Sequence, residues 1–205
     1  MNYLDALLAE ALIAAPGCPE TLVERALRVS ATAFYRDSEA WRVTLDPAPV
    51  IKGQREVEIE YPEGTFPVRT FWARLDGEVL EAISERNITD GAGTPRGYAI
   101  LGATAIAQLD VIPEQSYLRN GLVVHVAIAP SNEQEEVPDE LFAMHRNGIL
   151  FGAQASLLAM PNVSWGNLQL ASVYTGMADA EKMKAQRTSK AQQSPVVRKV
   201  RYGGI

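Results

Sequence analysis

The sequence predicts an α+β protein: a helical bundle of about four helices with an inserted small antiparallel β domain and an extended C-terminal arm. Three observations lead to this prediction. Apolar residues recur at helical spacing in 1–40 and 131–190, they alternate with polar residues in 41–130, and segment 191–205 combines alternation with glycines. Because consecutive elements usually pack on their neighbours, the simplest arrangement places the β domain between the second and third helices.

The N-terminal segment predicts two short helices joined by a tight turn. Leucines and alanines recur every three or four residues in 2–15, and a Pro-Gly pair ends this pattern. Pro19 suits the first position of a second helix, in which Glu24 and Arg28 have the i,i+4 spacing of an ion pair.

The middle of the chain predicts about seven short strands, arranged as a small sandwich or an open barrel. Asp76-Gly77 follows the β-rich segment 68–75 and predicts a hairpin, because this dipeptide tolerates the positive φ angles of a two-residue turn. We expect irregular loops at 47–53 and 88–95.

Helical periodicity returns after the strands. A third helix is expected over 138–160, with acidic residues in its first turn, and a fourth over about 164–190. The apolar stripe of the fourth helix is expected at Leu170, Tyr174 and Met177.

Three small residues lie four apart on the third expected helix: Gly148, Gly152 and Ser156. Small side chains at this spacing let another helix approach closely, and each internal glycine costs roughly 1 kcal/mol of helix propensity. We therefore expect a packing role for these positions. The alternative is that the helix tolerates them without such a contact.

Charge is distributed unevenly along the chain. The net charge is −6, yet residues 181–205 contain seven Lys or Arg and one acidic residue, which leaves −12 on the other 180 residues. This pattern argues against a general nucleic-acid-binding face and for a basic extension on an acidic body. A solvated tail is the alternative interpretation.

Few residues suit catalysis or metal binding. The only histidines, His125 and His145, have no partner at metal-ligand spacing, so a core or interface position is favoured for both. Cys18 is the single cysteine, which excludes an intrachain disulfide and favours a reducing compartment. We expect no enzymatic activity, no metal, no cofactor, no export signal and no membrane-spanning segment.

Other chemical signals have simpler interpretations. The glycine-rich segment 91–97 precedes a predicted strand rather than a helix, so a phosphate loop is disfavoured. Alternating glutamates predict a solvated strand face at Glu56, Glu58 and Glu60. The tryptophans could form ligand platforms, although core sealing is favoured for Trp41, Trp72 and Trp165.

Three sequence blocks together resemble the head-to-tail connector (adaptor) proteins of tailed bacteriophages. The first runs from Leu4-x-x-Leu7-Leu8 into Ala15-Pro16-Gly17-Cys18-Pro19 and continues with Ala26-Leu27 and Ala33-Phe34 before Trp41. The second is Val126-Ala127-Ile128-Ala129-Pro130-Ser131 with Pro138-Asp139-x-Leu141. The third is Ile149-x-x-Gly152-Ala153-x-Ala155-x-Leu157-Leu158-Ala159-Met160-Pro161 with Trp165. Each block is a packing motif rather than a catalytic signature.

The resemblance implies a virion structural protein of the phage neck, assembled in the host cytoplasm. Such adaptors form a ring, commonly of twelve copies, beneath the portal protein. The implied partners are the portal, neighbouring subunits and a downstream tail or nozzle protein, with viral DNA passing through the lumen. Two other classes stay open: a host- or carbohydrate-binding β module on a helical stalk, and, less favoured, a small hydrolase.

The C-terminal arm is the expected contact with the portal or a neighbouring subunit. Its apolar and basic residues suit a strand added to an exposed sheet edge: Val196, Val197, Arg198, Lys199, Val200, Arg201, Tyr202 and Ile205. A DNA channel is expected to be acidic or neutral, with candidates at Glu133, Glu135, Glu136, Asp139 and Glu140.

Overall fold

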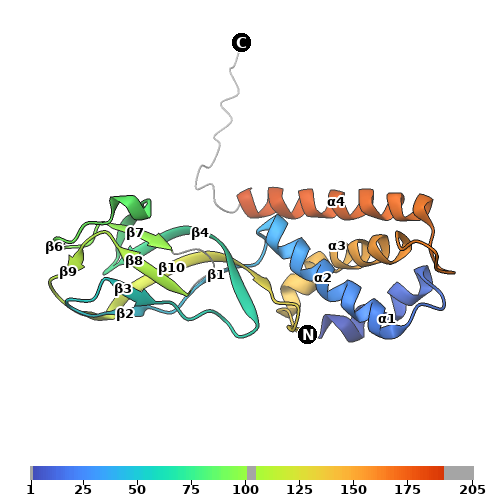
Figure 1. Ribbon diagram of the computed structural model, residues 1–205, viewed down its shortest axis with the longest axis horizontal. Helices are drawn as coiled ribbons and strands as arrows, with labels where there is room; N and C mark the ends of the chain where they lie inside the picture. Colours follow the sequence, from blue (N-terminus) through green and yellow to red (C-terminus); the bar gives the residue numbers. More distant parts are fainter. Residues whose placement is uncertain (1, 101–104, 192–205) are drawn as a thin grey trace, which may run out of the picture.

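The computed structural model describes residues 2–100 and 105–191 and has a helical unit at one end and a β unit at the other (Figure 1). The helices are α1 (Tyr3–Ala14), α2 (Glu20–Ser38), α3 (Asp139–Leu158) and α4 (Leu168–Ala191). The strands are β1 (Arg42–Thr44), β2 (Ala48–Val50), β3 (Glu56–Glu58), β4 (Thr65–Leu75), β5 (Glu78–Ala82), β6 (Ala92–Gly93), β7 (Gly97–Ile100), β8 (Ile106–Leu109), β9 (Ile112–Pro113) and β10 (Tyr117–Pro130), with a 3-10 turn at Glu85–Asn87.

Local signals explain where the first two helices begin and end. The Asn2 side chain caps α1 by accepting a hydrogen bond from the Leu4 amide at 2.9 Å. Pro19 is the residue before α2 rather than its first residue, so the expected start was wrong by one position. Glu39 ends α2 in the left-handed conformation, with φ at 52°.

Two glycines of α3 lie where α2 crosses it. A Cβ on Gly148 would lie 2.3 Å from Cε2 of Phe34, and one on Gly152 would lie 2.3 Å from Oγ of Ser30. Side chains of α2 therefore occupy the space that a methyl group at either position would need. Ser156, one turn further along α3, is exposed, so the tight contact is limited to the two glycines.

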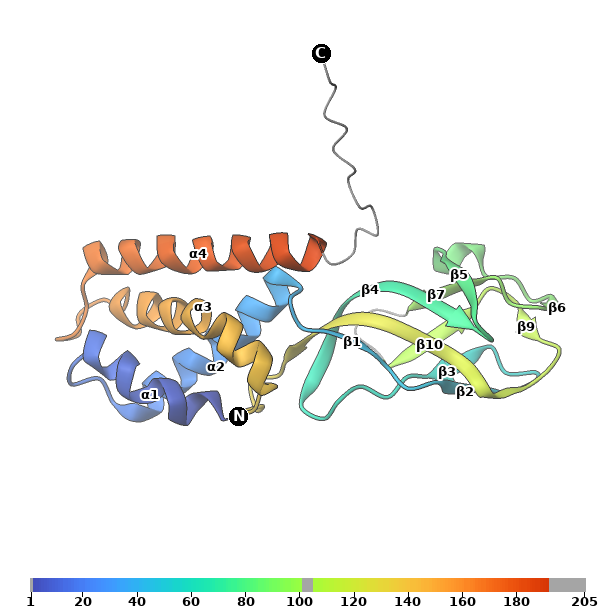
Figure 2. The same ribbon diagram turned by 180° about the vertical axis from the view of Figure 1, so that it is seen from behind.

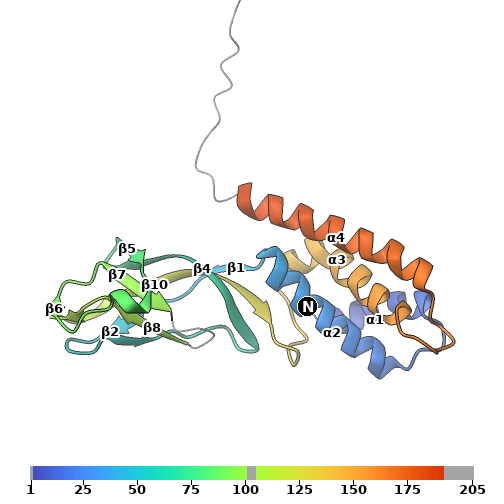
Figure 3. The ribbon, with the colours of Figure 1, turned by 45° about the horizontal axis from the view of Figure 1, so that its top comes forward.

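The expected apolar stripe of α4 was wrong in part. Leu170 and Tyr174 are half-buried, and the Tyr174 ring stacks on Phe151 with centroids 5.9 Å apart, but Met177 is 45% exposed. The buried residues of α4 are Ala171, Ala185 and Ser189. Small residues face inward because α4 lies along one side of the bundle against α3 and α2, which leaves its other side uncovered (Figure 3).

The prediction of a small antiparallel β domain was wrong. Seven strands, β1-β10-β4-β5-β7-β8-β3 in order, form a large curled sheet, which β2 joins as an eighth by pairing with β10, while β6 and β9 pair separately. The large sheet is mixed, because β5 and β7 pair in parallel at Glu81–Gly97 and Ala82–Tyr98. Alternation of apolar residues reports burial and not strand direction, so it could not reveal this pair.

The two longest strands account for much of the difference in size. β4 has 11 residues and β10 has 14, and they pair antiparallel along most of their length. Register shifts after His125 and Ala127 interrupt the period of two. The hairpin between β4 and β5 is confirmed, with Asp76 and Gly77 at φ 52° and 86°. The segments expected as loops contain the short strands β2 and β6.

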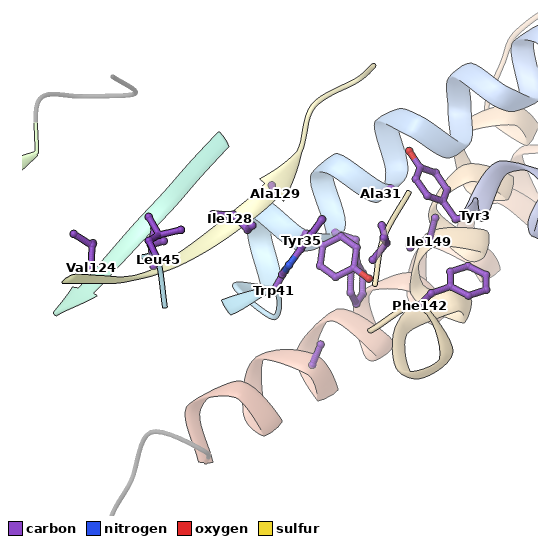
Figure 4. Close-up of a cluster of buried hydrophobic side chains, with 14 of the residues drawn as sticks. Tyr3, Ala31, Tyr35, Trp41, Leu45, Val124, Ile128, Ala129, Phe142 and Ile149 are labelled. Atoms are coloured by element: carbon purple, nitrogen blue, oxygen red, sulfur yellow. The ribbon is translucent and has the colours of Figure 1, made fainter. Parts of the chain in front are cut away.

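One hydrophobic core connects the two units (Figure 4). Tyr35 and Trp41 are buried with ring centroids 5.6 Å apart, and the Ile128 amide donates a hydrogen bond to the Trp41 carbonyl at 2.9 Å. Tyr3 ties the N-terminus to the connection after β10, because its hydroxyl donates to the Gln134 carbonyl at 2.7 Å. Trp41 therefore seals the core, as expected.

Candidate interaction surfaces

The outer face of β1, β10 and β4 carries a cluster of cationic and aromatic side chains, named here the arginine–aromatic face. Its members are Arg42, Arg69, Phe71, Trp72, Arg74 and His125. The strand register brings them together, since Ala127 lies opposite both Arg42 and Arg69, and His125 lies opposite Trp72. Phe71 has no partner in β10, because a bulge adds it to β4 at this point.

Stacking organises this face. The Trp72 and His125 rings are nearly parallel, at 14°, with centroids 5.2 Å apart, and the Arg74 guanidinium lies 4.7 Å from the Trp72 centroid. The Arg42 guanidinium lies 4.2 Å from the Phe71 centroid. Such contacts hold arginine heads in place without neutralising their charge.

Hydrogen bonds fix Arg42 between the two units. Its side chain donates to the carbonyls of Glu39 at 3.0 Å and Ser189 at 2.7 Å, so it joins the ends of α2 and α4 to the sheet. The Glu39 carboxylate forms an ion pair with Arg69 at 3.3 Å. In the part of the chain that the structure describes, neither Arg42 nor Arg74 has an ion pair.

The electrostatics of the face favour an anionic partner. Burial, followed by the nearby Arg42 charge, lowers the pKa of His125, so this ring is neutral at pH 7. Burial also lowers the pKa of the Arg42 guanidinium, although arginine stays protonated at neutral pH. Because hydrogen bonds and burial occupy the Arg42 guanidinium, the exposed Arg74 is the group that can bind a carboxylate or phosphate here.

Sequence reasoning missed this face. A core or interface position was favoured for His125 and core sealing for Trp72, whereas both are half-exposed on the outer side of the sheet. The period-two spacing of Trp72 and Arg74 was one available signal. Arg42 lies 30 residues earlier, and only the pairing of β1 with β10 brings it close.

His145 lies in the helical unit instead. Its ring is tilted against Phe34, with centroids 5.3 Å apart, and lies edge-on to Tyr35 at 6.1 Å. Burial is the largest influence on its pKa, which is lowered. The ring packs within an aromatic cluster, and Glu181 and Lys184 of α4 are its charged neighbours.

The sheet does not close, and its two ends face each other across a cleft, named here the open seam. The edge at β1 and β2 forms one side and β3 with β8 the other, around a volume of about 1290 Å³. Four acidic residues line it: Asp46, Glu56, Glu58 and Glu60. The open seam therefore offers a negatively charged groove beside an unpaired strand edge.

The predicted arm contacts lie outside the described residues: Val196, Val197, Arg198, Lys199, Val200, Arg201, Tyr202 and Ile205. Within 2–100 and 105–191, no three His, Cys, Asp or Glu side chains are grouped so that they could hold a metal ion. Across the same residues, no helix has the length and apolar character needed to cross a membrane.

Comparison with known proteins adds no assignment. A scan against protein-family models matches no family, and a search of curated proteins finds no match. A function for this chain therefore has to be argued from the resemblance of its three sequence blocks and from the surfaces described above.

Proposed function

We propose that this protein is a structural adaptor of the phage neck. In this role, copies form a ring that docks on the portal and connects it to a tail or nozzle protein, while DNA passes through the lumen. The twelve-copy ring common among such adaptors is the expected assembly. The role requires no catalysis or cofactor, and its location is the neck of the virion.

The uncovered side of α4 is the observation that carries this proposal. Of the ten large hydrophobic side chains exposed in the described part of the chain, four belong to this helix: Leu168, Val173, Met177 and Met183. Val173 and Met177 are 53% and 45% exposed and lie one turn apart. Apolar side chains gathered along one helix are typical of a protein–protein contact.

The β unit, at the other end of the molecule from α4, offers a surface of different chemistry. The arginine–aromatic face on the β unit suits an acidic protein surface, whereas α4 suits an apolar one. A connector must bind partners on more than one side, and these two surfaces differ in chemistry as separate partners would require. Glu135, in the acidic segment 133–136 before α3, forms an ion pair with Arg28 of α2. This ion pair ties the acidic segment to the helical unit.

The proposal is tested by adding portal protein to the full chain. We expect light scattering after size exclusion to show a monomer or weak association alone, and electron microscopy to show a ring on the portal. Replacing both Val173→Asp and Met177→Asp should abolish attachment. Val79→Asp with Leu118→Asp, which changes two residues of the β unit that are 64% and 69% exposed, is the matched control. A wild-type protein that leaves portal unbound would refute the adaptor role.

The carbohydrate-binding alternative receives less support from the structure. A sugar platform needs an aromatic ring with an open face. The Trp72 ring instead stacks on His125 and lies beneath Arg74. Glycan-array binding that disappears in Trp72→Ala would favour this alternative over the adaptor.

A further inference from the structure

We propose that the open seam binds the C-terminal segment 194–205 of a second copy, which adds as a strand along the free edge of β3. The inference rests on the proposed function in one respect: a ring places two copies side by side. The inference identifies the receptor for the arm, the face of β3 that its cations meet, and a contact that joins one copy to the next.

Among the described residues, only β8 pairs with β3, so the backbone of β3 has a second edge with no partner strand there. β3 pairs with β8, and the residues that bond to β8 alternate: the Arg55 carbonyl accepts from the Leu109 amide at 3.1 Å, and the Ile59 amide donates to the Ala105 carbonyl at 2.6 Å. In an antiparallel pair the intervening residues direct their backbone groups away from the partner strand. The amides and carbonyls of Glu56 and Glu58 therefore point to the other edge of β3.

The seam lies at this edge. β2 is near β3 but is hydrogen-bonded to β10, so the curled sheet stops without joining its two ends. An unpaired edge accepts an added strand through main-chain hydrogen bonds, and pockets on either side select its side chains. An extended segment that enters the seam would bridge the two ends of the sheet.

Side chains around β3 match the arm on both faces. Glu58 is exposed on the same face as Glu56 and Glu60, whereas Val57 and Ile59 are each 2% exposed on the opposite face. Within the described residues, Glu58 and Glu60 form no ion pair. An added strand therefore meets carboxylates on one face and apolar side chains on the other.

The arm has the corresponding alternation. If this segment is extended, Lys199 and Arg201 share one face of the strand, and Val200 and Tyr202 share the other. Paired beside β3, the two cations would face the glutamates, while the apolar residues would lie toward the core. Opposite charges on directly paired strands are favourable, and the reverse register would place cations against apolar side chains.

The position of the helical unit favours a second copy over the same chain. The end of α4, which the arm follows in sequence, lies at the top of the helical unit beside the β unit in Figures 1 and 2, whereas β2 and β3 lie on the lower side of the β unit. Only residues 192 and 193 separate α4 from the proposed strand. A contact between copies needs no path around the sheet.

Disulfide trapping between two full-length variants tests the inference. Chains carrying Glu58→Cys are mixed with chains carrying Lys199→Cys at high protein concentration and oxidised. The native Cys18 is 5% exposed and stays in both. We expect a cross-linked heterodimer that is on the order of tenfold more abundant than with Arg74→Cys on the arginine–aromatic face, because several weak ion pairs act together.

Charge reversal provides a matched control. Glu56→Lys with Glu60→Lys should reduce the trapped dimer about tenfold. Glu78→Lys with Glu81→Lys changes the net charge equally on the exposed strand β5 and should leave it unchanged.

Three results would overturn the inference: trapping no greater than with Arg74→Cys, insensitivity to reversal at β3, or only intrachain cross-links in the Glu58→Cys/Lys199→Cys chain. The experiment uses no portal. If trapping fails while rings still form on portal, the arm binds elsewhere and the adaptor role stands; if trapping succeeds while portal is not bound, the adaptor role fails instead.

Discussion

In the helical unit, α2 and α3 approach so closely that Gly148 has no space for a methyl group beside Phe34. In the β unit, the edges at β2 and β3 face each other across about 1290 Å³ without pairing. The first contact is closed by packing within one chain, and the second is left open and lined with carboxylates. A closed contact contributes stability, whereas an open edge is available to a partner.

The charges on the open edge also limit which partner can use it. Glu56 and Glu58 repel the same edge of another copy, and charged residues of this kind protect sheets from unspecific pairing. A strand with basic residues is not repelled. The seam is therefore suited to one class of segment, one that carries basic residues.

The largest expected effect is on the buried side of α2. Leu27 has no exposed surface, so Leu27→Ala should lower the free energy of unfolding by about 2–5 kcal/mol through lost burial and a cavity. Val29, two residues later, is 48% exposed, and Val29→Ala should change it by no more than about 0.5 kcal/mol. Urea denaturation of both variants provides the measurement; equal midpoints would show that α2 is not packed as described.

Gly148→Ala examines the closed contact directly. The new Cβ would lie 2.3 Å from Phe34 Cε2, so the helices must separate, at a cost of about 1–3 kcal/mol. Better helix propensity recovers at most about 1 kcal/mol. We expect a lower thermal midpoint, and partial recovery when Phe34→Leu is added. A variant as stable as wild type would show that the contact between α2 and α3 has space for a methyl group at position 148.

Local features of the fold were predictable from the sequence, and features that depend on distant segments were not. The Asp76-Gly77 turn was identified because its chemistry lies in two adjacent residues. The parallel pairing of β5 with β7 was missed, since it depends on the route of the chain between Ala82 and Gly97. No short sequence pattern specifies that route.

The same reasoning explains the candidate sites. The tight positions Gly148 and Gly152 were visible as a spacing, whereas the arginine–aromatic face was hidden by the bulge at Phe71 and by the distance to Arg42 in sequence. The open seam depends on where the curl of the sheet stops. Its acidic strand was noticed only as a solvated face.

A smaller, pH-dependent effect separates two buried phenols. Burial raises the pKa of Tyr3 from 10.0 to about 12 and raises that of Tyr35 further. The folded state favours the neutral phenol, so this contribution to stability is complete below pH 10 and is lost as pH rises through 12. Tyr3→Phe should cost about 1 kcal/mol at pH 7, through the lost hydrogen bond to Gln134, and less at pH 11.

Tyr35→Phe is the comparison for that measurement. Among the described residues, the Tyr35 hydroxyl has no hydrogen-bond partner, so its removal should cost nothing at pH 7. The removal should also reduce the loss of unfolding free energy at alkaline pH. Urea midpoints at pH 7 and pH 11 distinguish the two variants. A cost for Tyr35→Phe equal to that for Tyr3→Phe would contradict the assigned contacts.

A small effect of the opposite sign is expected in the uncovered helix α4. Gly176 lies inside α4, and a Cβ there would meet nothing within 4 Å, so Gly176→Ala should raise the free energy of unfolding by up to about 1 kcal/mol. The same change places a methyl group on a helix proposed to dock on a partner. We therefore expect a higher thermal midpoint for the isolated protein but weaker attachment to portal, whereas Gly148→Ala lowers the midpoint. A midpoint lowered by Gly176→Ala would show that α4 is already covered within the free protein, and would remove the observation on which the adaptor role depends.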